Sequence, residues 1–499
     1  MRRLRLFLLA AVALCVAAPA ARAQLHVVVR VSPVADLAHQ LDCVTGIVHV
    51  CGTADYRQLW RERFLRDAAD TAAAQAWGRL RARYAVDYRI DTASTDAVGR
   101  EHRHVSLSQR WRLAGLQARS WEDYDERLAL LLLPRDRARV ATITAHFRPR
   151  FLAWWEAESR DRLTRGRDSV AALLDGPELR GLLAGARRFY DATGPGTDTV
   201  TLTLVSRPGL VRGSTNAEVV EGWAVQELTP TASAARETGV TLHEVAHLML
   251  SLATDTTRAA VAAGLARAGV EGRAVRSLLD EGLATAFGNG LVERTVRPVA
   301  TWAAYVERPL SFYNDDVIDV AGKALMPVLD SLLRAGATLR EPATLDAIRR
   351  AVATAMGPRL LSPRALLHDV WGFVDDGVAE PFAVTRALQR GLRAGNFSLG
   401  VDSTGGMPTE TLARDPWIGA VVVAPPRALT TLAARGAFRA SEVAAIRRAA
   451  AAGPVLYGAR RANGARTWVV VARSSKEALP LVERMIALDR DVDGVVRVP

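Results

Sequence analysis

The sequence predicts an α+β fold in which two groups of strands are separated by long helical regions. Residues 56–163 repeat apolar side chains at helical spacing over several long stretches. Residues 198–205 (DTVTLTLV) alternate polar and apolar side chains, which is typical of a strand with one buried face. Residues 415–499 alternate short β-rich runs with helical ones, so a small α/β domain is expected at the carboxyl end.

The first 23 residues have the features of an export signal. Three arginines among the first five residues form a positive region, residues 6–16 are apolar, and Ala21-Arg22-Ala23 is a small-x-small cleavage site. The apolar run is shorter than a membrane-spanning helix requires, and no later stretch reaches that length. We therefore expect a mature protein that has no transmembrane segment and is periplasmic or extracellular.

Two cysteines remain once this signal is removed, Cys43 and Cys51. A pair of cysteines eight positions apart in an exported chain favours a disulfide over two free thiols. His39 and His49 lie nearby, but the spacing of the four residues matches no familiar zinc pattern, so a metal role is disfavoured.

Residues 24–195 are expected to form a mostly helical region. It opens with a β-branched run at 25–31 (LHVVVRV), which predicts a strand. Helical patterns follow at 56–84, 111–133 and 140–163.

Residues 196–400 are expected to form the functional core. The alternating strand at 198–205 and a second β-rich stretch at 218–228 come shortly before an apolar helical stretch at 240–250. This last stretch contains His-Glu-x-x-His, with His243 and His247 one helical turn apart on the same face.

Two imidazoles in this arrangement are typical of half a zinc site. Glu244 lies about 100° around the same helix, where it can reach a water molecule at the metal without being a ligand. A chance pair of core histidines is the alternative, but polar side chains buried without partners in an apolar helix are costly.

A third ligand is offered by Glu281, in the helical pattern of residues 277–286. It stands in Glu281-Gly282-Leu283-Ala284, and an ordinary solvated carboxylate is the alternative role. Together the two motifs make residues 229–333, about a fifth of the chain, resemble the gluzincin metallopeptidases. The resemblance implies Zn²⁺ bound by His243, His247 and Glu281, and Glu244 as general base.

The same resemblance implies further parts of the site. A twisted sheet precedes the zinc helix in gluzincins, and its edge strand binds substrate, which points to residues 213–222. A tyrosine or histidine often stabilises the oxyanion, and Tyr313 is the first candidate here, ahead of Tyr305 and His368. Packing beside the next helix, which Asn314 or Asp315 would cap, is the alternative role for Tyr313.

One position departs from the gluzincin pattern. Four residues after the glutamate ligand, where some members carry an acidic partner for a ligand histidine, this chain has Thr285. Asp280 is the available substitute.

Helices are expected to continue over residues 341–400. Residues 401–414 are rich in Gly, Ser, Thr and Pro and are expected to be a linker. The order βαββαβ over 415–499 matches a ferredoxin-like unit, which by itself indicates no function.

The charge of the chain argues against one class of partner. The formal net charge is +12, but the basic residues are scattered and almost all Arg, with lysines only at positions 323 and 476. No basic run is interleaved with aromatic residues, so nucleic-acid binding is not expected.

The sequence as a whole predicts a secreted zinc peptidase that acts on a peptide or protein, with endopeptidase and exopeptidase activity both open. The alternative is a catalytically silent, peptidase-like binding protein of the cell envelope. Glu244 beside both histidines favours turnover, because binding alone needs no general base.

Overall fold

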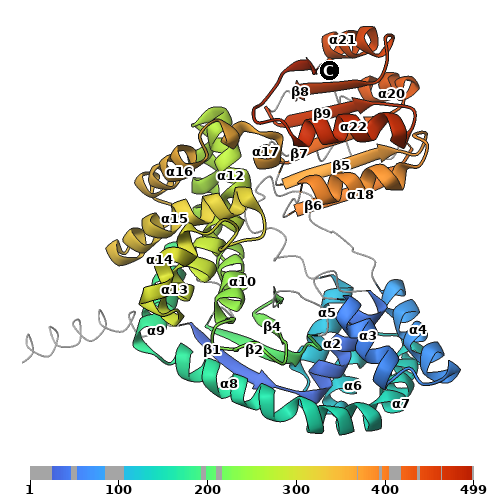
Figure 1. Ribbon diagram of the computed structural model, residues 1–499, viewed down its shortest axis with the longest axis vertical. Coiled ribbons are helices and arrows are strands. Elements are labelled where there is room, and N and C mark those ends of the chain that lie inside the picture. The colour runs from blue at the N-terminus through green and yellow to red at the C-terminus, as the bar shows by residue number, and fades with distance from the viewer. Residues whose placement is uncertain are drawn as a thin grey trace, which may run out of the picture.

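The computed structural model describes most of the chain as a mixed α+β fold with two β-sheets (Figure 1). The described residues are 25–46, 53–84, 106–192, 198–209, 216–367, 369–392, 396–403, 417–434, 439–461 and 464–496. The expected export signal, Cys51, His368 and most of the expected linker lie outside them. The disulfide and the signal therefore remain predictions.

The amino-terminal part is mainly helical, as expected, but its first element is the strand β1 (His26–Val31). Ser32 caps the first helix by accepting a hydrogen bond from the backbone N–H of Ala35, and Gly46 ends it in the left-handed conformation. The helices are α2 (Pro33–Thr45), α3 (Thr53–Arg63), α4 (Ala68–Arg83), α5 (Leu107–Gln117), α6 (Trp121–Ala129), α7 (Pro134–Glu158), α8 (Arg160–Leu174) and α9 (Pro177–Tyr190).

The first sheet has four strands in the order β1-β2-β4-β3. The alternating segment forms β2 (Thr199–Ser206), as predicted, and β2 pairs in parallel with β1 and with β4 (Trp223–Leu228). The edge strand β3 (Ala217–Val220) is antiparallel to β4. Glu221 and Gly222 join these two strands with φ values of 47° and 78°, a turn that suits a tight hairpin.

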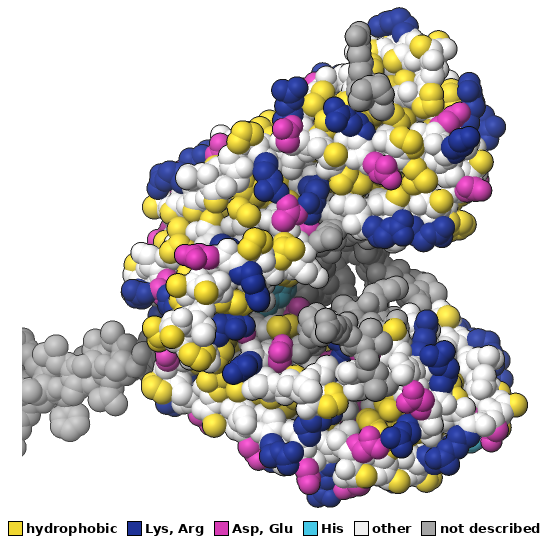
Figure 2. Space-filling model, viewed as in Figure 1, with side chains coloured by type: hydrophobic (Ala, Val, Ile, Leu, Met, Phe, Trp, Pro, Cys, Tyr) yellow, Lys and Arg dark blue, Asp and Glu magenta, His cyan; other side chains and the backbone are white. Residues whose placement is uncertain are grey.

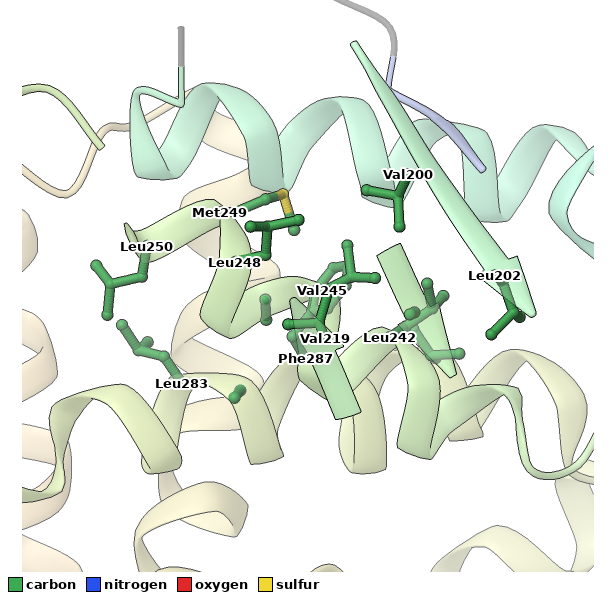
Figure 3. Close-up of a cluster of buried hydrophobic side chains, with 14 of the residues drawn as sticks. Val200, Leu202, Val219, Leu242, Val245, Leu248, Met249, Leu250, Leu283 and Phe287 are labelled. Carbon is green, nitrogen blue, oxygen red and sulfur yellow. The ribbon is translucent and has the colours of Figure 1, made fainter. Parts of the chain in front are cut away.

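Alternate residues of this sheet face different helices. In β2 and β4, even-numbered positions face α10 (Thr238–Ser251) and α8, and Figure 3 shows Val200 and Leu202 gathered with Leu242 and Val245 of α10. Odd-numbered positions such as Val205 face α2 and α5. The sheet is thus buried on both sides, and α10 lies directly on it.

A second group of helices completes this part of the molecule. Asp315 caps α15, one of the two residues expected to do so, by accepting from the backbone N–H groups of Val317 and Ile318. The elements are α11 (Asp255–Ala266), α12 (Gly269–Ala284), the π-helix η2 (Thr285–Val292), α13 (Glu293–Val296), α14 (Val299–Glu307), α15 (Asp316–Ala335), α16 (Pro342–Met356), the 3₁₀ helix η3 (Gly357–Leu361) and α17 (Pro363–Leu366).

The carboxyl-terminal part is a six-stranded sheet in the order β10-β8-β9-β7-β5-β6. One face is covered by α18 and α22 and the other by α20 and α21 (Figure 1). The elements are β5 (Asp369–Asp375), α18 (Pro381–Leu392), β6 (Asn396–Asp402), β7 (Gly419–Ala424), the 3₁₀ helix η5 (Pro426–Ala428), α20 (Leu429–Ala434), α21 (Ala440–Ala450), β8 (Val455–Arg460), β9 (Arg466–Val471), α22 (Ser475–Ile486) and β10 (Gly494–Val496).

This sheet corrects two expectations. Helices were expected throughout 341–400, but β5 and β6 lie there and pair in parallel, so the sheet begins before the expected linker. The order βαββαβ does occur after the linker, but its topology is not ferredoxin-like. The last strand, β10, pairs with β8, because β5 occupies the free edge of β7.

The described helices include none that is both long and apolar enough to cross a membrane.

Candidate metal centre

Helix α10 supplies two buried histidines that face each other. His243 and His247 are 5% and 4% exposed, and their ring centroids are 4.7 Å apart with the rings nearly perpendicular. Their Nε2 atoms lie 3.1 Å apart. The spacing of four residues on one helix thus brings two imidazole nitrogens together, as the sequence indicated.

Helix α12 brings Glu281 to the same point. Its Oε2 lies 3.5 Å from His243 Nε2, and its Oε1 lies 3.7 Å from His247 Nε2. Tetrahedral zinc with bonds of about 2.0–2.1 Å holds its ligand atoms about 3.3 Å apart. The three observed separations bracket this value, so the donor set fits one small cation.

Asp280, the neighbour of Glu281, orients the second histidine. Its Oδ1 lies 2.6 Å from His247 Nδ1, which leaves Nε2 directed toward Glu281. Burial disfavours the charged form of His247, but Asp280 and Glu281 outweigh it and raise the pKa of His247 well above its usual range. Thr285 is fully buried, and its hydroxyl has no hydrogen-bond partner among the described residues. The acidic partner of the histidine is therefore Asp280.

Tyr313 lies against the other histidine. Its ring stacks on that of His243 with centroids 5.7 Å apart and an angle of 24°. The Glu281 carboxylate, then burial and the Glu244 carboxylate, raise the pKa of Tyr313 far above its usual range, and its hydroxyl donates a hydrogen bond to Glu281. The phenol is thus neutral and lies at the cluster of carboxylates and imidazoles.

Tyr305, the second candidate for this role, has its contacts elsewhere. The hydroxyl of Tyr305 donates a hydrogen bond to the backbone oxygen of Ser311, and its ring lies under the Arg297 guanidinium. Tyr305 therefore packs the segment that leads to Tyr313, and His368 lies outside the described residues.

Glu244 is the one half-buried residue between Thr241 and Ser251 on α10; the others are buried. Its carboxylate is close enough to raise the pKa values of both His247 and Tyr313. Glu244 therefore lies near both His247 and Tyr313.

The edge strand β3 runs beside α10, the helix that carries His243 and His247. It lies in the segment that the gluzincin resemblance indicated, and Val219 packs with Val245 of α10 (Figure 3). Figure 2 shows a hollow between the upper and lower parts of the molecule, with a histidine side chain visible at its back. An extended chain placed along β3 would pass next to α10.

A second group of possible ligands, which the sequence did not indicate as a set, is His39, Cys43 and Glu227. Glu227 is buried and already accepts hydrogen bonds from His39, Tyr56 and Asn216. These bonds and the nearby Arg207 are typical of a buried ion network between α2, α3 and β4. Sequence spacing could not reveal it, because Glu227 joins His39 only through the fold.

The structure brings together every residue that the motifs nominated for the metal site. No protein-family model, curated protein or solved structure matches the chain. The assignment of a function therefore depends on the chemistry and geometry of this cluster.

Proposed function

We propose that this protein is a zinc-dependent peptidase of gluzincin type. The observation that carries the proposal is the convergence of His243 Nε2, His247 Nε2 and the Glu281 carboxylate, with Glu244 next to them on the same helix. Two imidazoles and one carboxylate suit zinc, whereas Ca²⁺ and Mg²⁺ prefer oxygen ligands throughout. A three-ligand set of this kind is typical of catalytic zinc, which keeps a fourth position open.

Each residue of the proposed site has a separate role in peptide hydrolysis. Zinc in this site would supply Lewis-acid activation of water and of the peptide carbonyl. Glu244 accepts the proton of the attacking water and transfers it to the leaving amine. Tyr313 donates its hydroxyl proton in a hydrogen bond to the developing oxyanion, a role that needs the phenol to be neutral, as it is beside Glu281.

The surroundings favour an extended peptide as substrate. β3 is a free antiparallel edge among the described strands, and an extended chain can add to such an edge through backbone hydrogen bonds. The signal expected at residues 1–23 would place the activity outside the cytoplasm.

The proposal predicts a contrast between two variants. The wild-type protein should bind about one zinc per chain and cleave components of a mixed peptide library. Glu244→Gln keeps the ligands and the size of the side chain but removes its basicity, so zinc content should persist while hydrolysis falls by at least about 10²-fold. His243→Ala should lose both, because the two remaining ligands hold zinc poorly. Metal analysis and mass spectrometry of the peptides measure these outcomes.

Three results would contradict the proposal. Absence of zinc after incubation with the metal would show that His243, His247 and Glu281 do not form a zinc site. Zinc bound without cleavage of any peptide would instead favour the catalytically silent binding protein. Equal rates of hydrolysis for wild type and Glu244→Gln would show that Glu244 is not the general base.

A further inference from the structure

The segment that carries Tyr313 is held by one carboxylate. Asp319, on α15, accepts hydrogen bonds from three backbone N–H groups of residues 310–313. The N–H of Leu310 lies 3.1 Å from Oδ2, and those of Phe312 and Tyr313 lie 2.8 and 3.2 Å from Oδ1. Asp319 is only 4% exposed, so these bonds are shielded from water.

Lys323, one helical turn after Asp319 on α15, makes a second set of contacts with this segment. Its Nζ lies 2.8 Å from Asp319 Oδ2 and donates to the backbone oxygen of Arg308 at 2.6 Å. A buried carboxylate needs a nearby opposite charge, and residues four apart on a helix are placed to provide it. The pair therefore binds both ends of the 308–313 segment to α15.

The segment needs such a restraint because its backbone is irregular. Leu310 has a φ of 56°, in the left-handed region that a branched side chain adopts only when the surroundings impose it. Phe312 is buried and stacks on Tyr305, which fixes the middle of the segment. Tyr313 follows directly, with its ring on His243.

We propose that Asp319, paired with Lys323, is a positioning residue that sets Tyr313 against His243. This inference rests on the proposed function, in which the Tyr313 hydroxyl acts on the reacting carbonyl. Small errors in the placement of such a group lower the rate steeply. Asp319 itself reaches no substrate and acts only through the backbone of residues 310–313.

Asp319 can be removed without removing the start of its helix. The cap of α15 is Asp315, which accepts from the N–H groups of Val317 and Ile318. Asp319→Ala should therefore release the segment but leave α15 in place. Asp330→Asn is a matched control, because Asp330 is also a paired carboxylate on α15 but interacts with Arg294 and Arg334 instead.

The first test measures hydrolysis. Asp319→Ala should lower kcat about 10- to 100-fold with KM and zinc content nearly unchanged, as should Tyr313→Phe. The double variant should be no slower than Tyr313→Phe alone, because both changes remove one function. Asp330→Asn should keep the wild-type kcat. Unchanged kcat in Asp319→Ala, or fully additive losses, would overturn the proposal.

The second test needs no activity and so separates this inference from the proposed function. In protein labelled with ¹³C-histidine, the stacked ring of Tyr313 shifts the Cε1–Hε1 resonance of His243, which His243→Ala identifies by its loss. Asp319→Ala should move this resonance and speed amide exchange at residues 310–313, and Asp330→Asn should do neither. An unmoved resonance would overturn the positioning role, even if the wild type cleaves peptides.

Discussion

Asp280 and Glu281 are adjacent in sequence but reach different atoms of the same imidazole. Asp280 contacts His247 Nδ1, and Glu281 lies near His247 Nε2. Adjacent helical residues point about 100° apart, so the two carboxylates approach the ring from separate sides. An acceptor at Nδ1 fixes the tautomer and orientation of a histidine ligand.

Asp280→Asn should therefore weaken zinc binding without removing a ligand. The amide cannot stabilise the imidazole as a carboxylate does, and losses of such partners typically cost 10- to 100-fold in metal affinity. Thr285→Val is a matched control, since it removes the polar atom at the position where some gluzincins carry an acidic partner for a ligand histidine. Competition with a chelator of known affinity measures the effect, and equal zinc affinity in the two variants would contradict it.

At the scale of elements, α10 and the π-helix η2 are in backbone contact. A Cβ atom at Gly288 of η2 would lie 2.4 Å from both the Gly239 oxygen and the His243 nitrogen on α10. Position 288 therefore has no room for a Cβ atom, and the contact occurs at His243, the first of the proposed zinc ligands. The π-helix follows directly after the helix that carries Glu281.

Gly288→Ala should push α10 and η2 apart. We expect a loss of about 1–3 kcal/mol in the free energy of unfolding, the usual cost of overpacking, together with weaker zinc binding. Gly181→Ala is the control, because a Cβ there meets nothing within 4 Å and alanine favours a helix. Urea denaturation of the metal-free proteins measures the free energy of unfolding of both variants, and competition with a chelator measures their zinc affinity. A Gly288→Ala protein as stable as Gly181→Ala would show that the helices can adjust.

The sequence was most informative where one local pattern determines structure. The spacing of His243 and His247 and the alternation in 198–205 each depend on a single element. The structure confirms the helix that places both histidines on one face and the strand at 199–206. β5 was missed because its short apolar run (VWGFV) has no periodicity that distinguishes strand from helix. The pairing of β7 with β5, and the contact of Gly288 with α10, depend on residues far apart in sequence, which no local pattern encodes.

At the scale of the whole molecule, one large hydrophobic core joins the amino-terminal helices, the first sheet, η2 and the helices α10 to α12 and α15 to α17. The carboxyl-terminal sheet has two cores of its own, one on each face. The carboxyl-terminal part meets the rest of the molecule where Arg273 and Arg276 of α12 lie over the ring of Trp417, at 5.8 and 5.6 Å. The helix that carries Glu281 therefore also contacts the carboxyl-terminal part.

Buried charged groups make the stability of the folded protein depend on pH. Asp70 on α4 is 1% exposed and contacts His146 and Arg150 on α7. The hydrogen bond from Arg150, supported by the backbone N–H of Arg66 and by His146, holds the pKa of Asp70 well below its usual range. An acid whose pKa is lowered by folding stabilises the protein above its unfolded pKa of about 3.9, and this contribution is lost as the pH falls further.

Asp70→Asn should therefore destabilise the protein at pH 7 by about 2–4 kcal/mol, because Arg150 loses its buried carboxylate partner and His146 loses the carboxylate oxygen that it contacts. The difference in the free energy of unfolding between wild type and Asp70→Asn should stay nearly constant from pH 7 to 5 and then become smaller. By pH 3 it should have shrunk by about 1 kcal/mol, since the wild-type carboxylate still resists a proton that the unfolded chain accepts. Glu126→Gln, at an exposed position on α6, should show no gap at any pH. Urea denaturation at each pH measures these differences, and a gap that does not narrow below pH 4 would mean that the folded and unfolded chains bind the Asp70 proton equally well.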